Sequence, residues 1–211
     1  CYICSPTAAY IDYAIEETRH FTKSPALNQM LTGLIKACRP LVRATGLDHQ
    51  VQPNNWLFST NPLPALTQTA AQAIRDDMVK AHPTRAIVIR SLNDVADTKS
   101  MQALSDAGFL LLPARQVYIF DGAQARMTKD AKSDLKLLQK SDYAIEDAHH
   151  FSAEDFTRAA LLYDMLYRGK YSKLNPGYGP ALLAQAHQIG LLTITGLRGA
   201  DGQLDGIIGR F

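Results

Sequence analysis

The stretch FTRAALLYDMLYRGKYSKLNP, residues 156–176, constrains the fold of this chain more than any other segment. Its apolar residues recur at i, i+3 and i+4 spacing, which predicts a helix with one face packed against a sheet. Ser152, with Asp155 three residues later, predicts a capping box at the start of this helix. The residues of the predicted buried face are Leu161, Leu162, Met165 and Leu166.

Polar side chains follow the predicted helix. Gly169 predicts its end, because glycine readily takes the left-handed conformation that closes many helices. Pro176 closes the loop that follows. This loop carries the ammonium, hydroxyl and amide groups of Lys170, Tyr171, Ser172 and Asn175, and we predict it to be the functional site.

Composition limits the class of protein. The chain has 211 residues, of which 46% are hydrophobic and 20% charged, so it can bury a core in one large domain or two small ones. Lysine and arginine total 22 against 20 acidic residues, a balance that does not predict nucleic acid as a partner. No segment approaches the roughly 20 apolar residues of a membrane span, so we expect no membrane association.

The cysteines predict reduced thiols rather than a metal site or a disulfide. There are three, an odd number, and the spacing Cys1-x-x-Cys4 lacks the second pair that a zinc site of this type needs. We therefore expect a cytoplasmic protein without a bound metal, with zinc or a disulfide as the alternatives. The chain begins without methionine and stops at Phe211 within a predicted strand, so we expect it to be part of a longer protein.

The first part of the chain alternates apolar runs with helical patterns. The run AIVIR, residues 86–90, predicts a central strand buried on both faces. Pro40 predicts a kink in the second helix, and Gly46 predicts its end. The predicted elements are a strand at 2–4, helices at 5–21 and 25–45, a strand within 50–60, a helix at 65–81, the strand at 86–90, a helix at 97–107, and strands at 109–112 and 116–120.

The second part contains a predicted hairpin. Two apolar runs, residues 191–197 and 204–211, flank a loop that contains Asp201 and Gly202, a pair typical of hairpin turns. Before it come predicted helices at 131–140 and 180–189, on either side of a strand at 143–147 and the long helix. The segment 121–130 has few apolar residues, which predicts domains at 1–125 and 126–211.

The order of elements in residues 143–211, strand, two helices joined by a loop, then an antiparallel hairpin, resembles the opening half of the GNAT acyltransferase fold. Residues 50–120 are similar to its closing half. Two such halves in tandem resemble the FemABX-like proteins. The resemblance implies a mixed α/β fold of tandem GNAT-like units, with residues 1–125 as a first unit and residues 126–211 as the N-terminal half of a second, apparently incomplete unit.

The resemblance also implies a function, N-acyl transfer from acyl-CoA or acetyl-CoA to a small-molecule or peptide amine. Two alternatives stay open: a donor of aminoacyl-tRNA type, and a noncatalytic GNAT-like module that binds a partner. GNAT enzymes hold the donor's pyrophosphate in a glycine-rich loop that opens a helix. Residues 59–64 occupy that place in the first unit, but they contain prolines and no glycine. In the second unit we expect this loop beyond Phe211.

Acyl transfer to an amine needs a base, donors for the developing oxyanion and an acid for the leaving thiolate. Tyr171 is the predicted acid or a substrate-positioning hydroxyl, with Lys170, Ser172 and Asn175 as substrate-binding groups. The alternative is an ordinary surface loop with a packed tyrosine and solvated lysines.

Other polar residues stand at predicted strand ends. Arg90 and Arg115 are predicted to hold a substrate carboxylate, although pairing with nearby aspartates explains them equally well. Asp147, His149 and His150 follow the strand at 143–147 and offer a base, or are ordinary turn residues.

Overall fold

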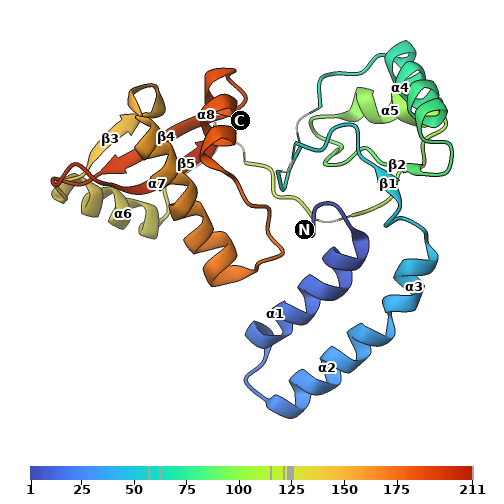
Figure 1. The fold of residues 1–211 in the computed structure, drawn as a ribbon, viewed down its shortest axis with the longest axis horizontal. Helices are drawn as coiled ribbons and strands as arrows, with labels where there is room; N and C mark the ends of the chain where they lie inside the picture. Colours follow the sequence, from blue (N-terminus) through green and yellow to red (C-terminus); the bar gives the residue numbers. More distant parts are fainter. Residues whose placement is uncertain (57, 62, 115, 121, 123–125, 211) are drawn as a thin grey trace. The chain divides into compact units, whose positions relative to one another are not determined.

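The computed structural model describes residues 1–56, 58–61, 63–114, 116–120, 122 and 126–210 (Figure 1). The chain divides into two compact units, Cys1–Tyr118 (unit 1) and Ile119–Phe211 (unit 2). Both contain helices and a small sheet, so the mixed α/β class is confirmed. The predicted domain boundary after residue 125 lies outside the described residues. No helix in the described ranges has the length and apolar character needed to cross a membrane.

Unit 1 begins with a helical region. A turn occupies the predicted strand at 2–4, and the predicted kink at Pro40 is confirmed as a break at Cys38. Gly46 ends the region with a φ of 71°. The apolar stripe of α2 stays largely in solvent, because no residue of this helix is buried. The helices are the π-helix η1 (Ala8–Tyr13), α1 (Ala14–Phe21), α2 (Pro25–Ala37) and α3 (Arg39–Ala44).

The rest of unit 1 packs around two helices, α4 (Gln68–Ala81) and α5 (Thr98–Asp106), both close to their predicted positions. Thr67 caps α4 by accepting a hydrogen bond from the Ala70 amide, and Gly108 follows α5 with a φ of 91°. The core between the two helices is small. It consists of Ala71, Ala103, Leu104 and Ala107, with Leu66, Ile89, Leu92 and Phe109 packed against it.

The prediction of a long buried strand at 86–90 was wrong. Strand β2 is only Ala86–Ile87, half-buried, and pairs in parallel with β1 (Gln50–Val51). Pro53 follows β1 and has no N–H to continue the ladder. Instead the Asn54 side chain bonds the backbone of Arg90, donating to its carbonyl (2.9 Å) and accepting from its amide (3.1 Å). A side chain thus replaces the strand partner and ends the sheet.

The predicted strands at 109–112 and 116–120 are also wrong, since the described residues there are irregular. Leu110, Tyr118 and Phe120 are 87%, 89% and 82% exposed. Of the predicted strand within 50–60, only Gln50–Val51 (β1) forms among the described residues, and Trp56 is 50% exposed. Strand-forming residues need a neighbouring strand to pair with, and these segments have none among the described residues.

Unit 2 is built on a three-stranded antiparallel sheet in the order β3-β4-β5. The predicted hairpin is confirmed, with Gly202 at a φ of 80° in its turn. The helices and the strand expected around it are confirmed within a few residues. The elements are α6 (Lys129–Lys140), β3 (Ala144–Asp147), the 3₁₀ turn η2 (Ala148–His150), α7 (Ala153–Tyr163), the π-helix η3 (Asp164–Tyr171), α8 (Pro180–Gln188), β4 (Thr193–Arg198) and β5 (Leu204–Arg210).

Helix α7 packs on β5 and α8 through a different face from the one predicted. Its buried residues are Ala159 and Ala160, whereas Leu161 and Met165 are 49% and 59% exposed. Small side chains let the helix approach the sheet closely. The core that it covers includes Leu183, Ala186, Leu192, Ile194 and Leu204.

The start of α7 is tied to the hairpin. The predicted capping box of Ser152 and Asp155 is confirmed, with both reciprocal hydrogen bonds present. The Asp155 carboxylate also accepts from Arg198 at the end of β4 (3.0 Å), and Arg198 pairs in addition with Glu146 on β3. These contacts lower the pKa of Asp155 and raise that of Arg198. Arg198 therefore links the end of β4 both to the first turn of α7 and to β3.

Candidate functional site

The predicted site loop begins later than expected. Gly169 does not end the helix: it lies inside η3, and its φ is not positive. The helix closes instead where the Ser172 amide donates to the Tyr167 carbonyl (3.0 Å). This wide turn makes Tyr171 the last helical residue.

Two of the predicted site residues shape the loop. The buried Ser172 hydroxyl accepts a hydrogen bond from the Leu174 amide (3.0 Å). The Asn175 side chain donates to the Tyr167 carbonyl (2.7 Å), which also accepts from the Ser172 amide. Both side chains therefore hold the backbone around Tyr171.

The other two predicted residues of the loop face solvent. Tyr171 is 53% exposed, and the Lys170 ammonium lies 5.6 Å from the centre of its ring. A row of tyrosine rings leads to Tyr171 along the helix. The centroids of Tyr163 and Tyr167 are 4.6 Å apart, and those of Tyr167 and Tyr171 6.1 Å apart.

The two predicted substrate-binding arginines, Arg90 and Arg115, belong to unit 1. The Arg90 guanidinium donates to the Ile3 carbonyl (3.0 Å), so this side chain secures the start of the chain. Its backbone is paired with Asn54 as described above. Arg115 lies outside the described residues.

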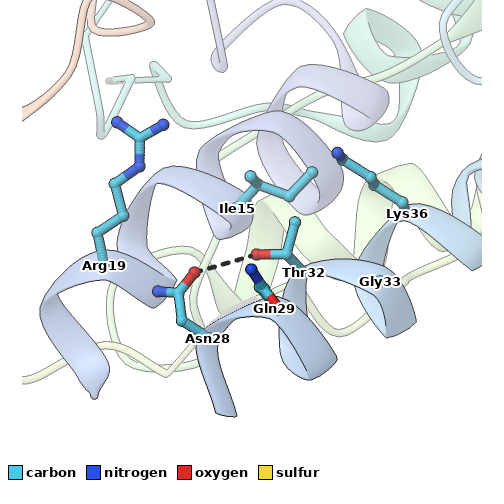
Figure 2. A pocket seen from close by; sticks show the side chains of 7 residues that line it. All are labelled: Ile15, Arg19, Asn28, Gln29, Thr32, Gly33 and Lys36. Atoms are coloured by element: carbon cyan, nitrogen blue, oxygen red, sulfur yellow. Dashed lines mark hydrogen bonds between the residues drawn. The ribbon is translucent and has the colours of Figure 1, made fainter. Parts of the chain in front are cut away.

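A groove between α1 and α2, which sequence reasoning did not single out, has a volume of about 390 Å³. Figure 2 shows Arg19 and Lys36 at its two sides, with the Asn28–Thr32 hydrogen bond (3.5 Å) between them. Ile15, Gln29 and Gly33 complete its lining. The groove is open, and its lining mixes polar side chains with the apolar side chain of Ile15.

A third arrangement brings together Asp147, His149 and His187 in unit 2. Asp147 ends β3 and caps η2, accepting a hydrogen bond from the His149 amide (2.9 Å). Its Oδ1 atom lies 3.8 Å from His149 Nε2 and 3.7 Å from His187 Nε2. The two imidazole rings have their centroids 4.4 Å apart. Of the predicted group Asp147, His149 and His150, the first two thus lie beside His187 of α8, and His150 is not part of this cluster.

His187 takes this position because the chain folds back after α8. Gly190, at a φ of 73°, reverses the chain and returns Leu192 to the last turn of the helix. The Leu192 amide donates to the Ala186 carbonyl (3.0 Å), and the Leu192 carbonyl lies 3.0 Å from His187 Nδ1. A carbonyl only accepts, so Nδ1 carries the proton.

The electrostatics of this cluster keep the carboxylate ionised. The hydrogen bond from the His149 amide lowers the pKa of Asp147, and the nearby imidazoles add to this effect. Sequence reasoning missed His187, because nothing in its spacing from Asp147 indicates that the turn at Gly190 joins them.

No protein-family model, curated protein or solved structure matches this chain. The function proposed below is therefore argued from the sequence and geometry of the chain.

Proposed function

We propose that this chain is part of an N-acyltransferase and that unit 2 has a GNAT-like fold. The connectivity of unit 2 carries the proposal. Strand β3 leads through α7 and α8 to the hairpin β4–β5, and all neighbouring strands are antiparallel. This order of elements is the one that the resemblance to GNAT acyltransferases implies.

The donor we propose is acyl-CoA or acetyl-CoA, and the acceptor is a small-molecule or peptide amine in the cytoplasm. The amine nitrogen attacks the thioester carbonyl, the carbon–sulfur bond breaks, and a proton leaves the nitrogen while the sulfur gains one. Tyr171 is the proposed proton donor to the thiolate, because its side chain is exposed at the end of a helix whose closing turn is held by Ser172 and Asn175. Lys170 supplies positive charge next to it.

A transfer assay tests this proposal. The gene product that contains this chain is given acetyl-CoA and a panel of amines, and acylated product is measured by mass spectrometry. Removing a general acid typically costs about 10²-fold or more in rate, so Tyr171→Phe should lower kcat by about that factor with little change in KM. Tyr10→Phe, an equally conservative change at a 56% exposed tyrosine of unit 1, should leave kcat unchanged.

Different outcomes separate the parts of the proposal. An unchanged kcat for Tyr171→Phe would remove Tyr171 from the acid role while the activity stands. Product formed only from aminoacyl-tRNA would replace CoA as the donor carrier. Absence of product with either donor would contradict the acyltransferase and favour a binding module.

A further inference from the structure

The imidazole of His187 has an unusual environment. Its side chain is 7% exposed, and among the described residues no group lies within hydrogen-bonding distance of Nε2. The bond from Nδ1 to the Leu192 carbonyl leaves Nε2 of the neutral ring with its lone pair free. Buried polar atoms in folded proteins nearly always have a partner, so this atom calls for one.

Nε2 of His187 lies close to the ligand atoms of the other two residues of the cluster. Asp147 Oδ1 lies 3.7 Å away, too far for a hydrogen bond, and the ligand atoms of Asp147, His149 and His187 all lie within 4.8 Å of one another. In a tetrahedral zinc site, bonds of about 2.1 Å place neighbouring ligand atoms about 3.4 Å apart. The atoms of the cluster are therefore somewhat farther apart than in a zinc site, and binding requires rotation of the exposed side chains of Asp147 and His149.

We propose that Asp147, His149 and His187 form a binding site for a divalent transition-metal ion of zinc type. Two imidazoles and one carboxylate are a donor set that zinc accepts, with a fourth position left open. Metal-binding histidines usually donate their second ring N–H to a carbonyl or carboxylate, and His187 donates to the Leu192 carbonyl.

The site joins two parts of unit 2 that are separate in sequence. Asp147 and His149 stand at the end of β3, and His187 stands in the last turn of α8. The side chains of Asp147 and His149 are 45% and 74% exposed, so the open position faces solvent. An ion bound by these three residues links α8 to the end of β3, and its fourth position holds an exchangeable water. This inference does not depend on acyl transfer, since it concerns a different group of residues.

Zinc titration of the metal-free gene product by isothermal calorimetry tests the site, in a background with Cys1, Cys4 and Cys38 changed to serine, because these exposed thiols also bind zinc. We expect one equivalent to bind. His149→Ala and Asp147→Asn should weaken binding by more than about tenfold, the scale that even outer-shell changes reach in metal sites. His20→Ala, at an exposed histidine of α1, should leave the affinity unchanged.

His187→Gln completes the test, with its fold checked by circular dichroism before metal is added. Co²⁺ serves as a second probe: its visible absorption in the cysteine-free protein should disappear in His149→Ala. No binding of Zn²⁺ at millimolar concentration, or an affinity that His149→Ala leaves unchanged, would overturn the proposal. Binding that is lost with the cysteines alone would do the same.

Discussion

The two units contain similar apolar segments but use them differently. In unit 2 the run that starts at Leu191 becomes strand β4, pairs on both sides and buries Ile194 to 2% exposure. In unit 1 the run at 109–112 stays irregular, and Leu110 is 87% exposed. Apolar and β-branched composition therefore does not make a strand by itself. A strand forms where the chain also brings a partner into register.

The turns explain the difference. Asp201 and Gly202 reverse the chain between β4 and β5, so the two runs meet directly. Pro113 follows the run at 109–112 and has no N–H for a ladder. In unit 1 even the paired strands β1 and β2 are two residues long.

The largest effect should follow from removing the buried side chain of β4. Ile194→Ala should lower the free energy of unfolding of unit 2 by about 3 kcal/mol, because it deletes packed methyl groups from the core. Ile208→Ala, in β5 at 68% exposure, should cost less than about 0.5 kcal/mol. Urea denaturation of both variants measures the difference. Equal losses would contradict the assignment of the buried face.

The hydrogen bonds of Asp48 should make the stability of unit 1 depend on pH, with an effect of intermediate magnitude. Hydrogen bonds from the hydroxyl groups of Ser5 and Thr7, and from the Thr7 amide, lower its pKa from 3.8 to about 2. A carboxylate with a lowered pKa in the folded state stabilises the fold above its unfolded pKa. That stability is lost as pH falls from about 4 through about 2.

Because Asp48 is partly exposed, the contribution is about 1 kcal/mol after allowance for solvent screening. Asp48→Asn should be less stable than the parent by about that amount at pH 5. The gap should close near pH 2, as measured by thermal unfolding across this range. A gap that stays constant with pH would refute this role of the carboxylate.

The smallest effect should come from the exposed run of unit 1. Leu110→Ser should change the free energy of unfolding by no more than about 0.5 kcal/mol, because the side chain is already in solvent. Leu104→Ala, in the core between α4 and α5, is the matched control and should cost about 2 kcal/mol or more. A large loss for Leu110→Ser, measured in urea, would restore the predicted strand at 109–112.

Local signals in the sequence predicted much of the fold. The capping box at Ser152, the kink near Pro40 and the hairpin turn at Gly202 depend on neighbouring residues, and the structure confirms them. The prediction of a strand over residues 86–90 was wrong because the side chain of Asn54, far away in the sequence, bonds the backbone of Arg90 in place of a strand. The prediction that Gly169 ends the helix was wrong, because the helix continues through Gly169 as the π-helix η3.

The candidate sites show the same division. The loop around Tyr171 is continuous in sequence, so the sequence alone could suggest it as a candidate. The contacts of Ser172 and Asn175 with the Tyr167 carbonyl could not be predicted in this way. The cluster at Asp147 needs His187, whose position depends on the packing of α8. Side chains brought together by tertiary packing leave no local pattern to read.

The central claim, that unit 2 carries acyltransferase chemistry, is tested most directly by hydrogen exchange with and without saturating acetyl-CoA. The measurement uses the gene product that contains this chain, with peptides covering both units. We predict slower amide exchange within residues 144–210 of unit 2 and no change in residues 1–118. Protection confined to unit 1, or none anywhere in the gene product, would contradict the account.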